Sequence, residues 1–132
     1  MAEDFVARIE RTGAFVKDAR KRTEDVEYRL QKIVLRIYPN VSGDDAKRLI
    51  AAERSLLDTC DTVYRLTVRQ AYKGARSLSE SAAEKELKHL ATLAAKAISE
   101  LSKLGAGRIE IRDLKAATRK MFRAYEKSIY FR

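Results

Sequence analysis

The chain has 132 residues, which is enough for one domain with a modest hydrophobic core and too few for two independent domains. Its 28 lysines and arginines outnumber 19 aspartates and glutamates, which gives a net charge of +9, and 45% of the residues are hydrophobic. This composition excludes a disordered tail, and the longest apolar run is far shorter than the roughly 20 residues that cross a bilayer. The single cysteine, Cys60, also excludes an internal disulfide and a cysteine-based metal cluster.

The first predicted helix covers about residues 2–38. Its apolar residues recur at alternating spacings of three and four, which is the narrow seam of a heptad pattern, and Pro39 ends it. An unbroken helix of this length would extend about 54 Å, whereas a compact globule of this size has a radius of gyration of about 14 Å. We therefore expect the helix to bend near Gly13 or to project as an N-terminal arm, residues 1–38. A projecting arm with so thin a seam needs another subunit or a ligand to cover it.

Two further helices are predicted in the middle of the chain. Ser42 can cap the second helix, which extends to about Lys73 or Arg76. The third helix, from about Glu80 to Leu104, is rich in alanine and leucine with nearly balanced charges, so we expect it to be the packing hub of the molecule.

A fourth helix ends the chain near Tyr130. Residues 108–112 alternate like a strand, but one short strand without a partner cannot form a sheet, so we expect an extended lead into the helix. The helix itself divides sharply into two faces, with Leu114, Ala117, Met121, Tyr125 and Ile129 on one and Arg112, Lys115, Arg119, Arg123 and Lys127 on the other. The sequence thus predicts a single all-α domain of about four helices over residues 1–132, with a compact helical bundle over residues 42–132.

No catalytic signature is present in the sequence. His89 is the only histidine, so no nucleophile is placed beside a histidine base. Glu86 and His89 have the Glu-x-x-His spacing of carboxylate-bridged metal bundles, but such sites need two copies of that motif. The two glycines at 105 and 107 are too close together for a phosphate loop, which also needs Gly-Lys-Ser/Thr. We therefore expect no enzyme, no metal site and no cofactor.

Basic residues gather in two helical stretches. Between Thr62 and Leu78 there are four basic residues and no acid, and after Gly107 there are eight basic residues and three acids. Helical spacing places the basic residues of each stretch on one face, and pairing within each helix is not expected to neutralise them. The alternative interpretation is a solvated or ion-paired surface, which is common on the helices of thermophile proteins.

Nucleic-acid phosphate is the predicted ligand of these stretches, because guanidinium groups bind phosphate oxygens in a bidentate way. Nothing resembles a base-reading motif, so binding is expected to follow the backbone without sequence specificity. The candidate contacts are Arg65, Arg69, Lys73, Arg76, Arg108, Arg112, Lys115, Arg119, Arg123 and Lys127, with Arg20, Lys21, Arg22 and Tyr72 as additional candidates.

Asparagine and glutamine occur only three times in the chain, a scarcity typical of proteins from hyperthermophiles. A small, basic, all-helical chain with a long N-terminal helix resembles the coat proteins of filamentous archaeal DNA viruses. In that family, paired helical subunits wrap double-stranded DNA, held in A-form, inside a helical filament. The resemblance implies that residues 1–38 are an arm on the nucleic acid and that the two basic stretches contact phosphates. It also implies that the partners are double-stranded DNA and either a second copy or a related coat subunit.

The resemblance implies a place in the virion after synthesis in the host cytoplasm, and the acidic N-terminus lacks the basic start and apolar core of a secretory signal. Two other interpretations stay open, both of them cytoplasmic. The chain also resembles the small helical subunit of an archaeal CRISPR effector complex, which lines an RNA or displaced-strand groove. Finally, a helix-bundle adaptor would present its basic faces to acidic proteins or to an anionic membrane surface.

Overall fold

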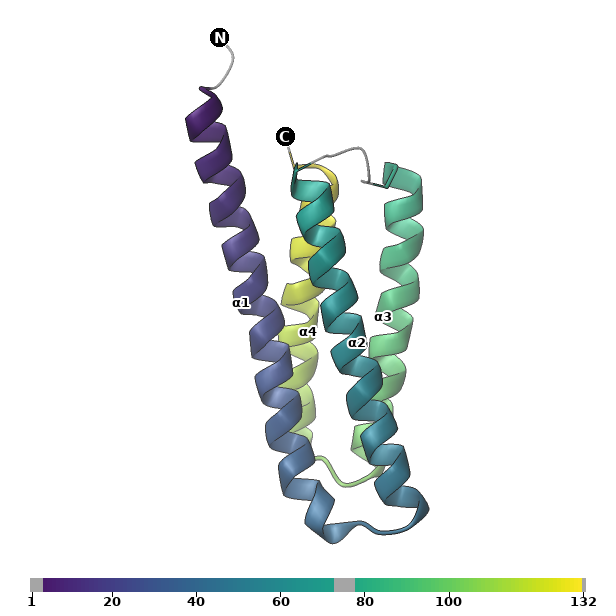
Figure 1. The fold of residues 1–132 in the computed structure, drawn as a ribbon. Helices are drawn as coiled ribbons and strands as arrows, with labels where there is room; N and C mark the ends of the chain where they lie inside the picture. The colour runs from purple at the N-terminus through teal and green to yellow at the C-terminus, as the bar shows by residue number, and fades with distance from the viewer. Residues whose placement is uncertain (1–3, 73–77, 132) are drawn as a thin grey trace.

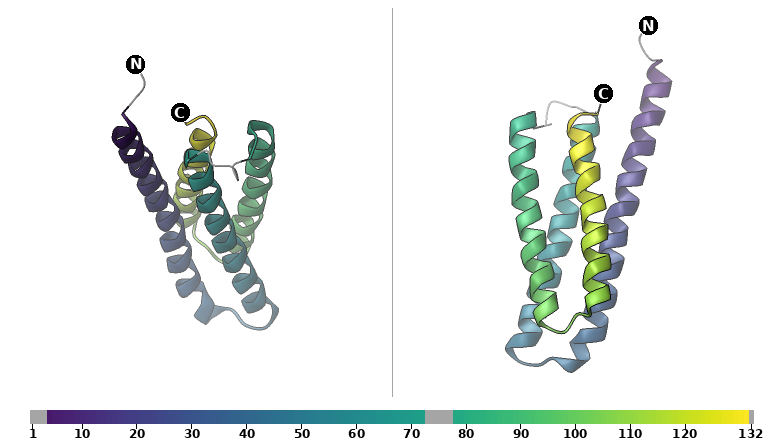
Figure 2. Two further views of the ribbon diagram at one scale, coloured as in Figure 1. Left: turned by 45° about the horizontal axis from the view of Figure 1, so that its top comes forward. Right: turned by 180° about the vertical axis from the view of Figure 1, so that it is seen from behind.

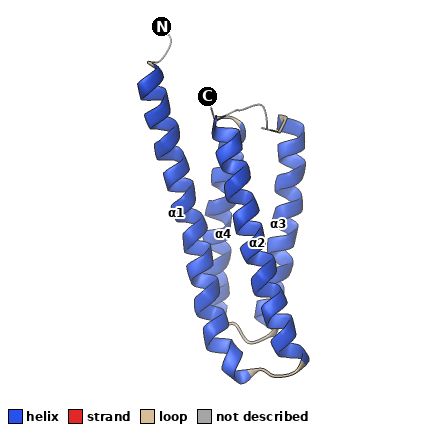
Figure 3. Ribbon diagram, in the orientation of Figure 1, coloured by secondary structure: helices blue, strands red, loops and turns tan. Residues whose placement is uncertain are grey.

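The computed structural model describes residues 4–72 and 78–131. These residues form four α-helices and one short 3-10 turn, and no strand (Figure 3). The elements are α1 (Phe5–Ile37), η1 (Tyr38–Asn40), α2 (Asp44–Tyr72), α3 (Glu80–Lys103) and α4 (Arg108–Ile129). The predicted all-α class and number of helices are therefore confirmed for the described part of the chain. The predicted end of the second helix, at Lys73 or Arg76, lies outside the described residues.

The helices form an up-and-down bundle (Figures 1 and 2). The central pair is α2 and α4, each of which contacts the other and both outer helices, while α1 and α3 flank this pair on opposite sides. The expectation that the third helix is the packing hub is therefore wrong, because α3 packs against α2 and α4, whereas each of these packs against all three other helices. In Figure 1, α2 lies in front of α4, and the view from behind in Figure 2 brings α4 forward. The outward faces of α2 and α4 consequently point in opposite directions.

Only the first turns of α1 project beyond the other helices, as Figure 1 shows at the N-terminal end. Residues 4–11 are all exposed, burial begins at Thr12, and the helix continues without interruption through Gly13. From Val26 to Ile37 the apolar seam contributes large side chains to the bundle core, because this half of the seam holds valine, leucine and isoleucine. The helix is therefore an arm at its start and a bundle helix over the rest of its length.

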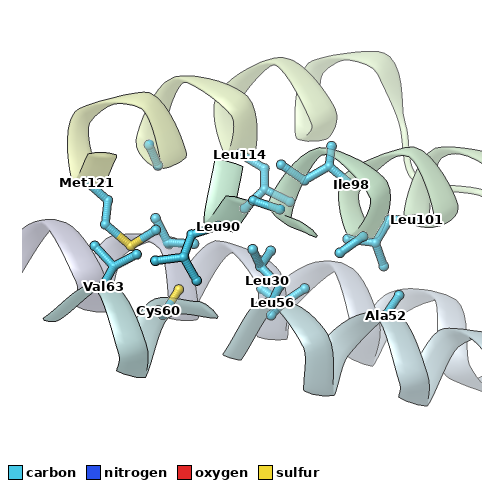
Figure 4. Packing of buried hydrophobic residues seen from close by; sticks show 14 of the residues in the cluster. Leu30, Ala52, Leu56, Cys60, Val63, Leu90, Ile98, Leu101, Leu114 and Met121 are labelled. Atoms are coloured by element: carbon cyan, nitrogen blue, oxygen red, sulfur yellow. The ribbon is translucent and has the colours of Figure 1, made fainter. Parts of the chain in front are cut away.

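The core is built from aliphatic side chains of all four helices (Figure 4). Leu30, Leu56, Leu101 and Leu114 are fully buried, one from each helix. Cys60 is buried among them, and the loss of solvation raises the pKa of its thiol to about 12. Such a thiol stays protonated at neutral pH and behaves as a small apolar side chain.

The expectation of an extended lead over residues 108–112 is wrong, because α4 is helical from its first residue. The carboxylate of Glu110 accepts a hydrogen bond of 2.8 Å from the backbone N–H of Gly107, which caps the helix. Arg36 of α1 pairs with the same carboxylate and donates to the Gly105 carbonyl at 3.1 Å. Capping and a contact far away in the sequence thus decide the local structure, and a five-residue alternation could reveal neither.

Candidate nucleic-acid interface

The basic face of α4 lies opposite a buried apolar face of the same helix. All five predicted side chains on that face are exposed, and the five predicted apolar side chains opposite are buried. The predicted division of this helix into two faces is therefore confirmed. Four of the exposed cations, Lys115, Arg119, Arg123 and Lys127, follow one another at one per turn and are called the α4 row below. At 1.5 Å per residue the row is about 18 Å long.

The cations of the α4 row have no ion-pair partner among the described residues. Arg108, in the first turn of the same helix, is likewise exposed and without an ion pair in that part of the chain. Arg112 differs, because its Nε lies 3.2 Å from a carboxylate oxygen of Asp113. The row therefore has its guanidinium and ammonium groups available for an external anion.

Two of the three acids of α4 contact arginines of α1. Arg36 pairs with Glu110, and Arg29 lies 3.9 Å from Asp113. The hydrogen bond from Arg36 is the main reason that the pKa of the Glu110 carboxyl lies below its ordinary value. Of the three acids that follow Gly107 in the sequence, only Glu126 is left without such a contact among the described residues. The net positive charge of the α4 face is thus larger than the local count of acids indicates.

A groove of about 900 Å³ lies between α3 and α4, and the α4 row forms one of its edges. The opposite wall consists of small residues of α3, and the apolar base includes Ile98, Ile111 and Phe122. Glu126 is the only acid in the lining, and it comes from α4. This α3–α4 groove brings together the predicted phosphate contacts and an apolar floor that the sequence did not predict.

The basic stretch of α2 is less available. Arg65 lies 3.1 Å from Asp61, one turn earlier on the same helix, so the expectation that pairing within the helix cannot neutralise it is wrong. Arg69 is exposed and has no ion pair among the described residues, and Tyr72 is also exposed. The other two members of the stretch, Lys73 and Arg76, lie outside the described residues. Since α2 and α4 face opposite ways, one rigid surface cannot contact both stretches of one molecule at once.

The additional candidates on α1 have contacts within the protein. Arg20 lies 3.3 Å from Glu24, and its guanidinium carbon is 5.0 Å from the centre of the Tyr64 ring. Arg22 lies 2.9 Å from Asp18 and donates to the backbone carbonyl of Lys120 at 3.2 Å. Lys21 is exposed. The two arginines therefore hold α1 against α2 and α4.

Lys120 is an exposed cation of α4 that was not among the predicted contacts. It lies beside the face that carries the row, next to α1, where Arg22 contacts its backbone carbonyl. Lys120 directly follows Arg119 in the sequence, and this neighbour could have identified it as a candidate contact. A selection of cations at spacings of three and four residues omits it. It extends the positive charge of this surface toward α1.

Metal ligands do not gather in the described structure. No group of three or more histidine, cysteine, aspartate or glutamate side chains there could hold a metal ion, and His89 is exposed. Among the described residues, no helix is both long and apolar enough to cross a membrane. Comparison with protein families, with curated proteins and with solved structures gives no match. The candidate function therefore depends on the chemistry of the α4 face itself.

Proposed function

We propose that this protein is a structural, non-enzymatic component of a virion that binds the phosphate backbone of double-stranded DNA and assembles with it into a helical filament. The α4 row carries the proposal, because its four exposed cations have no internal ion-pair partner in the described chain, while two of the nearby acids have arginine partners outside the row. Unpaired cations in a row bind a polyanion by releasing its counterions.

Binding without sequence specificity follows from the shape of this surface. The row lies on the side of an exposed helix whose opposite face is buried, and its arginines can take phosphate oxygens in a bidentate way. Four phosphate contacts would make log K fall with log salt at a slope of about −3.6. Base recognition would instead require side chains that reach base edges in a groove, and phosphate contacts carry no such information.

Assembly is supported by the projecting start of α1. Phe5, Val6 and Ile9 have 72%, 57% and 49% of their surface exposed, although they stand on a helix whose later residues are buried. Stacking of the Phe15 and Phe131 rings, 4.6 Å between centroids, fixes the direction of these turns against the end of α4. Three large exposed apolar side chains on a projecting helix favour contact with a second copy or a related subunit.

The test is a titration of the purified protein with long double-stranded DNA at low and high salt, with negative-stain electron microscopy of the product. The informative variant replaces Arg119 and Arg123 with Glu, and the matched control replaces the exposed Lys85 and Lys96 of α3 with Glu. Both variants change the net charge equally, so a general effect of charge would affect them alike. Single-stranded DNA and double-stranded RNA serve as competing ligands.

Regular filaments from the wild type and the control, and none from the α4 variant, would support the packaging function. Equal loss of binding in both variants would contradict it, because the interaction would then depend on overall charge. Preference for RNA or single strands without filaments would favour a subunit of a nucleic-acid effector complex. Absence of binding to all of these polymers would refute a nucleic-acid function.

A further inference from the structure

The two walls of the α3–α4 groove differ in character. One edge carries the α4 row, whereas the α3 wall carries small uncharged side chains such as Ala91, Ala95 and Ser99. On the floor, Ile98 is buried while Ile111 and Phe122 are half-buried. The groove is therefore apolar along its base and positively charged along one edge.

The floor distinguishes between classes of anionic ligand. A phosphate backbone has no apolar face, so DNA on the α4 row would leave the floor in contact with water. A lipid has an apolar tail, but its charge is concentrated in one headgroup, whereas the row spreads its cations over about 18 Å. An amphipathic helix offers both an apolar face and charged residues along its whole length.

The dimensions of the groove also fit a helix. Its lining on α4 extends from Ile111 to Lys127, which is about 24 Å or the length of a helix of about 16 residues. The small side chains of α3 allow another helix to approach closely, since packed helix axes lie about 8–10 Å apart. Carboxylates at every fourth position of such a helix would repeat at the same rise as the cations of the α4 row.

We propose that the α3–α4 groove binds an amphipathic helix of a partner protein, with the apolar face on the groove floor and a line of Asp or Glu side chains against the α4 row. This inference rests on the proposed function in one respect, because the helix takes the same cations that hold the DNA backbone. The two ligands therefore exclude each other, and the acidic helix keeps the protein off nucleic acid until it is displaced.

Direct binding is measured on the full chain in the absence of DNA. The probe is a labelled synthetic peptide of about 16 residues, with leucines on one helical face and glutamates beside them, followed by fluorescence anisotropy. A peptide of the same composition in scrambled order is the control ligand. We expect saturable binding of the amphipathic peptide and at least about tenfold weaker binding of the scrambled one.

A pair of tryptophan variants separates the floor from the cations. Ala95→Trp fills the groove from an exposed position of α3. Its matched control, Ala51→Trp, is at an exposed position in a separate groove that lies between α2 and α3. We expect Ala95→Trp to weaken peptide binding at least about tenfold and duplex binding less than about twofold. Ala51→Trp should change neither affinity, and circular dichroism melts confirm that both variants are folded.

Equal affinity for the two peptides, or peptide binding that Ala95→Trp leaves unchanged, would overturn the inference. Loss of duplex binding in Ala95→Trp would also overturn it, because the floor would then belong to the DNA site. Binding of phosphatidylglycerol vesicles that depends on Ala95, without peptide binding, would assign the groove to lipid instead. Peptide binding by a protein that does not bind DNA would refute the packaging proposal and the mutual exclusion of the two ligands, but not the binding of the helix. DNA binding without peptide binding would refute only the helix.

Discussion

The outward faces of α2 and α4 both look basic in the sequence, yet the fold treats their arginines differently. On α2, Arg65 is paired with an acid of its own helix, one turn away. On α4, Glu110 pairs with Arg36 of α1, and Asp113 contacts both Arg112 of its own helix and Arg29 of α1. The α4 row keeps no ion-pair partner in the described chain. The charge that a helix offers to a ligand thus depends on where its acids find partners, which a count along the sequence does not show.

The largest expected effect is a difference between the two faces. Replacing Arg119 and Arg123 with Glu should weaken duplex DNA binding by about a hundredfold or more, since two charge-assisted contacts become repulsive. The same change at Arg65 and Arg69 of α2 should weaken it by less than about tenfold, because Arg65 is already paired. Electrophoretic mobility shifts at one fixed salt concentration give both affinities. Equal losses would show that the two faces contribute alike.

A smaller effect on duplex affinity is expected when the ion-pair partner of Arg65 on α2 is removed. Asp61→Ala releases Arg65, so the α2 face should become more like the α4 face. Duplex affinity at low salt should then rise about two- to fivefold, a modest gain because exposed ion pairs are weak. Asp58→Ala, at an exposed position one turn earlier on the same helix, is the control for the loss of a negative charge alone. The same rise in both variants would mean that pairing of Arg65 is unimportant.

The smallest effect concerns stability and its dependence on pH. The pKa of Glu110 is lowered in the folded state by its hydrogen bond from Arg36, so the ionised carboxylate stabilises the fold above its ordinary pKa of about 4.3. That contribution to stability disappears as the pH falls through the lowered pKa that Glu110 has in the folded state. Glu110→Gln should therefore reduce the free energy of unfolding by about 1 kcal/mol at pH 7 and by progressively less in acid. Urea unfolding over a pH series measures this, and a difference that does not change with pH would contradict it.

Much of the architecture follows from the sequence because helix formation is governed by local patterns. The seam of α1, the alanine and leucine pattern of α3 and the two faces of α4 each repeat over many residues, and all three helices were predicted. The start of α4 was missed because two contacts override the short alternation: the local cap of Glu110 on Gly107, and the pairing of Glu110 with Arg36 of another helix. Five alternating residues are too few to outweigh such a contact.

The candidate site was predictable only in part. Helical spacing correctly placed the exposed cations of α4, since periodicity determines which side chains share a face. The packing of α3 against α4 creates the groove, and the groove contains alanines and a phenylalanine that no charge pattern identifies. The internal contacts of Arg20 and Arg22 likewise depend on helices that are distant in the sequence.

The most direct test of the α4 row as a phosphate-binding surface is the salt dependence of duplex affinity. The wild-type protein should give a slope of log K against log salt near −3.6 if all four cations contact phosphates. The variant in which Arg119 and Arg123 are replaced by Ala should give a slope shallower by about 1.8. An unchanged slope in that variant would place the DNA on a different surface of the protein.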